Sequence, residues 1–322
     1  MKKLRQSMVK VRVAFLQMSH WLAGWLYRLR TVLAIAAIFL ILAAWLALSF
    51  SGIGITSEIG SAGIPLSAND FSAIPQSVTD DAAELAAKVF REGQEKYNDF
   101  VDQLLGAYLE SKDKDFIILF NPGGWGWNAV ESSPGWQSIL NGIESELNGS
   151  GYTSLLLHYQ RTVDTSQGHI NELWEMSNGY STKAKDLADR VEFLTDHIPD
   201  LTVIIAGESN GTIICDTAMN ILTENPRVYS IQTGPPFWHT TTMLDRTLVL
   251  NDNGITPDSF SQGDFPAIIW GNLKAFFGLS QPEDAYGTIL HYVKAPGHDY
   301  WWQYPKVSSE INNFLEQNFG IK

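Results

Sequence analysis

The 322-residue chain has little cysteine. Cys215 is the single cysteine, which excludes an intramolecular disulfide. It stands among apolar residues, so we expect a small buried side chain and not a reactive thiol. No cluster of histidine, cysteine and glutamate has the spacing of a zinc site, and no internal repeat is found. These absences exclude disulfide-rich, zinc-bound and repeat architectures.

Basic residues are scarce beyond position 30. Of the 22 Lys and Arg residues, seven precede position 31, whereas all 35 acidic residues follow it. The 15 basic and 35 acidic residues that remain give this larger part a net charge of −20. Such an acidic body does not bind nucleic acid or anionic lipid headgroups through bulk electrostatics. We therefore expect no nucleic-acid partner.

One long uncharged run is present, at residues 31–50. About twenty apolar residues in a helix match the hydrocarbon thickness of a bilayer, so the run predicts a transmembrane anchor and the bilayer as a partner. The basic residues before it place the N-terminus in the cytoplasm and the rest of the chain outside it. A cleaved signal peptide is the alternative, with small residues at 47–49. The long basic segment and the length of the run favour a retained anchor.

The remaining sequence divides around this anchor. Residues 1–30 form a basic cytoplasmic segment, in which 11–27 mix aromatic and basic side chains and suit either an interfacial helix or a continuation of the anchor helix. Residues 51–76 are rich in Gly, Ser, Ile and Pro, which indicates a linker. Residues 77–322 then predict one folded domain, and apolar residues at helical spacing predict a long helix over 77–110.

From residue 114 onward, strand and helix signals alternate. The predicted strands are 116–120, 153–158, 202–206, 228–232, 247–251 and 288–293, and the predicted helices are 136–147, 182–197, 212–223 and 308–317. Alternation of this kind implies right-handed crossovers. The sequence therefore predicts an α/β fold, with a mostly parallel six-stranded sheet and helices on both faces.

A serine between two glycines follows the third predicted strand. Residues 207–211 are Gly-Glu-Ser-Asn-Gly, and an apolar helical pattern comes next. A sharp strand-to-helix turn requires glycine on both sides of the serine and exposes the hydroxyl. This nucleophile elbow makes Ser209 the candidate nucleophile.

Two further groups follow the carboxyl ends of predicted strands, where active sites of open parallel sheets lie. The glycine-rich loop after the first strand predicts an oxyanion hole, with one backbone donor from Gly124 or Trp125 and a second from Asn210. A serine nucleophile also needs a base, most often histidine. His298 is the best candidate, because it follows a Pro-Gly turn after the last strand.

The acid that orients the histidine is expected after the strand at 247–251. Asp252 is the first carboxylate there, and we predict it as the third catalytic residue. Asn253, Asp258 and Asp264 are the alternatives, since aspartates are also ordinary turn residues.

The order Ser209, Asp252 and His298, the elbow, the glycine-rich loop and the Pro-Gly-His-Asp-Tyr ending resemble the α/β-hydrolase superfamily over roughly residues 115–320. The acid segment departs from the frequent family form Asp-x-Ile-x-Pro, because Asn253 stands at the acid's place. The resemblance implies acyl transfer, in which Ser209 attacks a carbonyl, His298 moves the proton and water releases the acyl group. It implies neither a metal nor an organic cofactor.

Two features bear on the substrate. Only residues 234–246 separate two predicted strands, which leaves no room there for a large cap domain. The apolar segment 265–279 could be a lid, an acyl-binding wall, a bilayer-dipping segment or a helix packed on the core. We therefore predict a membrane-anchored serine esterase, lipase-like, acting on an apolar acyl ester. The alternatives are a catalytically inactive binding or scaffold protein and a serine peptidase or transacylase of the same fold.

Overall fold

The computed structural model describes residues 70–127, 129–242, 244–280, 286–289 and 293–321. They all belong to one compact unit, Thr56–Lys322. The predicted cytoplasmic segment, the anchor and most of the linker lie outside the described residues. Within the described ranges, no helix combines the length and the apolar character that a membrane span requires.

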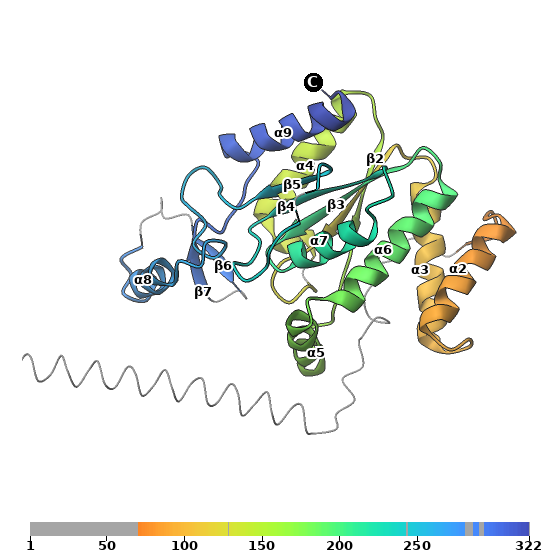
Figure 1. Cartoon of the computed structure of the whole chain (residues 1–322), viewed down its shortest axis with the longest axis horizontal. Helices are drawn as coiled ribbons and strands as arrows, with labels where there is room; N and C mark the ends of the chain where they lie inside the picture. The colour runs from red at the N-terminus through yellow and green to blue at the C-terminus, as the bar shows by residue number, and fades with distance from the viewer. Residues whose placement is uncertain (1–69, 128, 243, 281–285, 290–292, 322) are drawn as a thin grey trace, which may run out of the picture. The chain divides into compact units, whose positions relative to one another are not determined.

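The centre of the domain is a parallel sheet of five strands in the order β2-β1-β3-β4-β5 (Figure 1). The strands are β1 (Phe116–Asn121), β2 (Ser154–His158), β3 (Thr202–Glu208), β4 (Val228–Thr233) and β5 (Thr247–Leu250). Every residue of β1 is buried, as expected for a central strand covered on both faces. Five of the predicted strands are confirmed, with boundaries within two residues.

The prediction of a sixth strand in this sheet, at 288–293, is wrong. Two short strands, β6 (Tyr286–Ile289) and β7 (Val293–Pro296), pair with each other in antiparallel fashion and are separate from the main sheet. The helix α8 (Phe265–Phe276) lies beside β7, and its Asn272 side chain bonds both the N–H and the C=O of Lys294, at 3.0 and 2.8 Å. The side-chain amide of Asn272 thus takes the backbone N–H and C=O of Lys294, which a neighbouring strand would otherwise bond.

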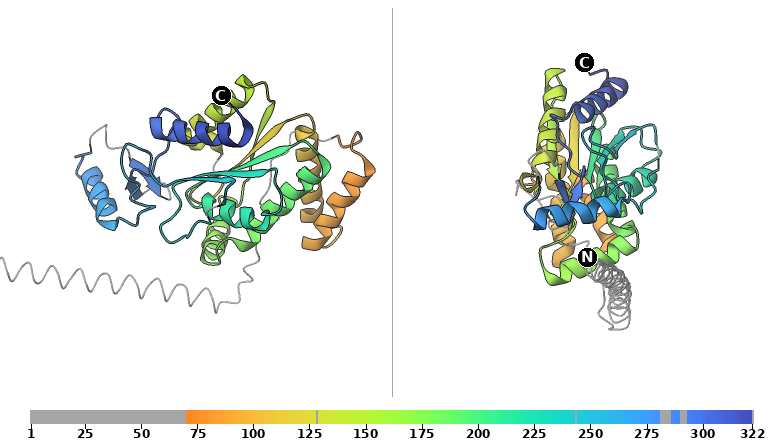
Figure 2. Two further views of the ribbon diagram at one scale, coloured as in Figure 1. Left: turned by 45° about the horizontal axis from the view of Figure 1, so that its top comes forward. Right: turned by 90° about the vertical axis from the view of Figure 1, so that its left-hand side faces the viewer.

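Helices cover both faces of the main sheet, as predicted (Figure 2). Along the strands, alternate side chains enter two separate cores: Ile117 and Val203 point into one, and Ile118 and Ile204 into the other. The first core is closed by α2 (Gln76–Val89), α3 (Glu95–Ser111), α6 (Ser181–His197) and α7 (Gly211–Ile221). The second is closed by α4 (Pro134–Gly149) and α9 (Pro305–Phe319).

The helices depart from the prediction in two places. The long helix expected over 77–110 is two helices, α2 and α3, because the chain turns at Gly93, whose φ is +80°. The structure also contains α5 (Ser166–Ser177), which the sequence analysis did not predict, and a short 3₁₀ helix, η1 (Val130–Ser132). Thr165 caps α5 by accepting a hydrogen bond from the N–H of Gly168.

Candidate active site

Ser209 lies at the sharp turn between β3 and α7, in the conformation that a nucleophile elbow requires. Its φ is +50°, a left-handed backbone angle that serine adopts at an energetic cost. The backbone N–H of Ser209 donates to the carbonyl of Thr233 on β4, 2.9 Å away, which holds the turn against the sheet. The predicted strand, turn and helix therefore surround Ser209 in the structure.

Both glycines of the elbow are required by close packing. A Cβ atom at Gly207 would lie 2.7 Å from the Sγ atom of Cys215, and one at Gly211 would lie 2.4 Å from the carbonyl oxygen of Asn121. The contact with Gly207 explains why Cys215 is a buried side chain. It is fully buried beneath the turn, as predicted, and burial raises the pKa of its thiol.

The structure brings Ser209 and His298 together although 89 residues separate them in the sequence. The Nε2 atom of His298 lies 3.1 Å from the hydroxyl oxygen of Ser209, and its Nδ1 atom lies 2.9 Å from a carboxylate oxygen of Asp258. A proton on Nδ1 is donated to the carboxylate, which leaves Nε2 free to accept the serine proton. His298 reaches this position on a turn after β7, where Gly297 has a φ of +77°.

Asp258 is fully buried and is held by several donors. Its carboxylate accepts hydrogen bonds from the backbone N–H groups of Phe260 and Ser261 and from the Tyr300 hydroxyl, at 2.9, 3.0 and 2.8 Å. Burial alone would raise the pKa of Asp258, but the hydrogen bond and charge of His298, with the other donors, lower it below the ordinary value. The group is therefore an anion at neutral pH and a partner for a charged imidazole.

Asp252 does not contact His298, so the prediction of this residue as the orienting acid is wrong. One of its oxygens accepts the N–H of Gly254, at 2.6 Å, and the other pairs with Lys306, at 3.3 Å. Asp264 caps α8 through the N–H of Ala267.

Asn253, one of the alternatives to Asp252, is buried and donates to the carbonyls of Gly297 and Asp299 at 3.2 and 2.9 Å. It thereby ties the acid loop to the turn that carries His298. The loop continues past this anchor before a carboxylate reaches the imidazole, which is why Asp258 makes the contact.

The glycine-rich loop after β1 lies beside the elbow, as predicted. The Asn210 side chain donates to the carbonyl of Gly124 at 3.4 Å, and Gly124 has a φ of +58°. The backbone N–H groups of Gly124, Trp125 and Asn210 donate no hydrogen bond to any other residue that the structure describes. They are therefore available to an oxyanion.

A buried charged cluster, which the sequence analysis missed, holds this loop from behind. The guanidinium of Arg161 is fully buried and donates to the carbonyls of Pro122 and, at 2.7 Å, Gly124. It also pairs with Glu172 of α5 at 2.7 Å. Further support comes from Tyr180 and Lys183, whose hydroxyl and ammonium lie 2.8 and 3.6 Å from the Glu172 carboxylate. Arg161 follows β2 at the same edge of the sheet, and this position was the available signal.

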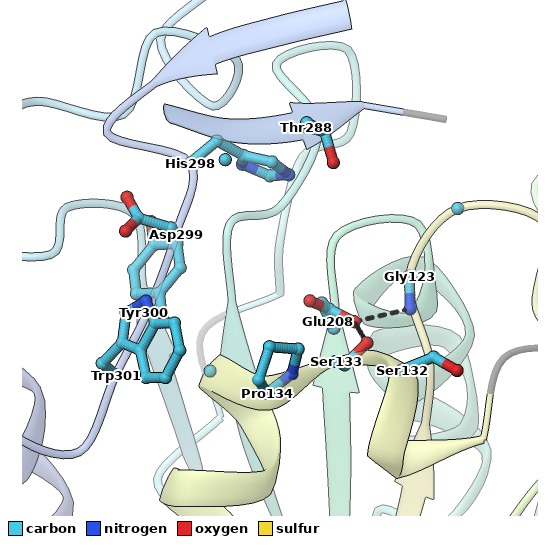
Figure 3. A pocket seen from close by; sticks show the side chains of 13 residues that line it. Gly123, Ser132, Ser133, Pro134, Glu208, Thr288, His298, Asp299, Tyr300 and Trp301 are labelled. Atoms are coloured by element: carbon cyan, nitrogen blue, oxygen red, sulfur yellow. Dashed lines mark hydrogen bonds between the residues drawn. The ribbon is translucent and has the colours of Figure 1, made fainter. Parts of the chain in front are cut away.

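Two hollows lie next to the candidate site, one lined by Glu208 and the other by Asn210. The polar hollow has a volume of about 230 Å³, and its wall includes Ser133, Glu208, Thr288, His298 and Asp299. Figure 3 shows Glu208 across this hollow from His298 and Thr288. One oxygen of Glu208 accepts the N–H of Gly123 and the hydroxyl of Ser133, both at 3.1 Å.

The second hollow, the apolar slot, has a volume of about 80 Å³. Its lining residues are Gly124, Trp125, Glu172, Leu173, Met176, Tyr180, Asn210, Trp238, Phe260 and Ile289. Only Gly124 lines both hollows.

Comparisons with known proteins do not identify a family for the chain. No protein-family model matches the chain, and no curated protein matches its sequence. Among solved structures, the chain is similar to Trichoderma reesei cutinase in complex with a C11Y4 phosphonate inhibitor, with 13% identity and a TM-score of 0.32 over 60% of this chain and 82% of that one. The interpretation of the site therefore depends on this chain's own sheet order, elbow and hydrogen bonds.

Proposed function

We propose that the protein is a serine esterase, with Ser209 as nucleophile, His298 as general base and acid, and Asp258 as the orienting carboxylate. One observation carries the proposal: a strained serine is hydrogen-bonded to a histidine whose other ring nitrogen is bonded to a buried carboxylate. This is the arrangement that activates a serine hydroxyl for acyl transfer.

The proposed reaction follows from the positions of these groups. The Ser209 oxygen attacks the ester carbonyl carbon while its proton passes to Nε2 of His298, and Asp258 stabilises the imidazolium. The negatively charged carbonyl oxygen accepts hydrogen bonds from the backbone N–H groups of Asn210 and of Gly124 or Trp125. The bond to the alcohol oxygen then breaks, and His298 returns the proton to that oxygen. Water, deprotonated by His298, releases the acyl group from Ser209 in the same way.

Geometry favours this function over a catalytically inactive binding protein. An inactive relative has no need to hold Ser209 within 3.1 Å of His298 or to bury a carboxylate behind the imidazole. A peptidase or a transacylase would use the same residues. These two activities are therefore tested as separate outcomes, with peptide substrates and with added alcohols as acyl acceptors.

We also propose that residues 31–50 anchor the enzyme in a membrane, with the catalytic domain outside the cytoplasm. The uncharged run and the basic residues before it support this proposal. The linker at 51–76 would then set the distance between the bilayer and the domain.

Labelling by a fluorophosphonate probe tests the proposed nucleophile. The full chain should react at Ser209, as located by mass spectrometry, and Ser209→Ala should abolish labelling. His298→Ala should slow it by about 100-fold or more, since it removes the general base. Ser309→Ala changes an exposed serine of α9 and serves as the matched control. Labelling that survives in Ser209→Ala would contradict the proposal.

A further inference from the structure

The two hollows border the residues on either side of the nucleophile in the sequence, and Ser209 itself lines neither. The polar hollow includes Glu208, the residue before Ser209, and the apolar slot includes Asn210, the residue after it. An ester also has two sides, an acyl chain and an alcohol. Each hollow can therefore receive one side of a substrate whose carbonyl carbon is held at Ser209.

The proton transfer decides which side enters which hollow. The leaving alcohol oxygen must receive a proton from His298, which lines the polar hollow but not the apolar slot. The N–H of Asn210, at the edge of the slot, faces the carbonyl oxygen in the proposed reaction. Resting on the proposed function, we propose that the substrate is an ester of a short acyl chain with an uncharged, hydroxyl-bearing alcohol.

The volume of the apolar slot limits the acyl chain. A cavity needs roughly 10–15 Å³ to hold one water-sized group, so the slot of about 80 Å³ has room for a short chain of several such groups and not for a long one. Its walls include Leu173 and Met176 of α5 and also Phe260. The ring centroid of Phe260 lies 4.9 Å from that of the His298 imidazole. One oxygen of Glu172 accepts hydrogen bonds from the Tyr180 hydroxyl and from Nε of Arg161, and the other lies 3.6 Å from the Lys183 ammonium. The slot therefore offers an acyl chain apolar contact of limited length.

The polar hollow suits an alcohol that carries hydrogen-bond donors. One oxygen of Glu208 is used by Gly123 and Ser133, and the other accepts no hydrogen bond from the described residues. Ser132, Ser133 and Thr288 supply further hydroxyl groups, and none of the described residues that line the hollow is Lys or Arg. Glu208 and Asp299 would repel a phosphate or carboxylate on the alcohol. A neutral polyol such as glycerol fits this surface.

An acyl-length series tests the slot. We expect kcat/KM of the full chain, measured on p-nitrophenyl esters from acetyl to palmitoyl in one detergent, to be highest at or below eight carbons and at least tenfold lower from twelve carbons on. Met176→Ala should move the optimum to longer chains, and Met176→Phe to shorter ones. Ile221→Ala, at the exposed end of α7, is the control and should leave the profile unchanged.

Long esters partition into the detergent equally for every variant, so this effect does not change the comparison between variants. A profile that rises steadily to palmitoyl, or an optimum that neither Met176 variant moves, would overturn the assignment of the slot.

A second series tests the polar hollow. Glycerol monobutyrate should have at least a tenfold higher kcat/KM than propyl butyrate, and glycerophosphate butyrate should be the poorest of the three. Glu208→Gln presents an amide N–H where the carboxylate oxygen stood, and should reduce the preference for glycerol over propyl by about tenfold. Equal rates for glycerol and propyl esters, or a preference that Glu208→Gln leaves intact, would overturn the assignment of this hollow.

The experiments distinguish a wrong substrate assignment from a wrong proposed function. If Ser209 reacts with the fluorophosphonate probe but the two series show no such selectivity, the substrate assignment is wrong and the esterase proposal stands. If Ser209 does not react, both are wrong.

Discussion

At the scale of single residues, the two aspartates of the acid loop have different expected roles. Asp258→Asn should lower kcat by about 10³–10⁴ at neutral pH, because an amide neither fixes the histidine tautomer nor stabilises the imidazolium. Asp252→Asn should change kcat by less than twofold, since Asp252 pairs with Lys306 in a contact that is partly exposed. Ester hydrolysis by both variants, alongside their melting temperatures, checks the difference. A comparable loss in the two would contradict the assignment.

The choice between these aspartates could not be made from the sequence. Each begins a turn by accepting a backbone N–H two residues ahead, Asp252 from Gly254 and Asp258 from Phe260. Local chemistry is therefore the same at both positions. The difference arises from a contact across 44 residues, the hydrogen bond from Asn253 to Gly297, which sets where the acid loop meets His298.

The roles of Ser209 and His298 had strong local signals, a Gly-x-Ser-x-Gly elbow and a Pro-Gly turn after a strand. Arg161 had no such signal. A buried arginine is recognised by its partners, and Glu172 belongs to a helix that the sequence analysis did not predict.

At the scale of elements, the elbow depends on contact between backbones. Gly211→Ala should destabilise the domain by about 1–3 kcal/mol, because its Cβ would press on the Asn121 carbonyl at 2.4 Å and overpacking of this kind costs such amounts. Gly149→Ala is the matched control, since no atom lies within 4 Å of a Cβ there and alanine favours the end of α4. Thermal unfolding of both variants provides the test. If Gly211→Ala were as stable as Gly149→Ala, the packing account would be wrong.

The same scale explains which parts of the fold were predictable. The five strands of the main sheet are short apolar runs bounded by turns, so their positions follow from local pattern. Residues 288–293 have a strand signal of the same kind in the sequence, but a local pattern does not determine which strand a segment pairs with. In the structure, Asn272 of α8 bonds the backbone of Lys294 in β7, and α8 itself exposes most of its apolar residues, including Trp270 and Phe276.

At the scale of the whole molecule, basic charge, acidic charge and the long uncharged run occupy different parts of the sequence. The net charge of −20 after position 30 follows a segment that contains only basic charges. An acidic domain is not attracted to anionic lipid headgroups, so electrostatics would not hold it at a membrane. Retention at a bilayer would therefore depend on the uncharged run at 31–50.

The orientation across the membrane can be tested because Cys215 is the single cysteine and is fully buried. A cysteine introduced at the exposed Glu224, Glu224→Cys, should react with a membrane-impermeant maleimide in intact cells. Ser7→Cys, among the basic residues that precede the anchor, should react only after permeabilisation, since the positive flank remains in the cytoplasm. The unmodified chain should stay unlabelled in both conditions. Labelling of Ser7→Cys in intact cells, with Glu224→Cys protected, would reverse the proposed orientation and place the esterase site on the cytoplasmic side.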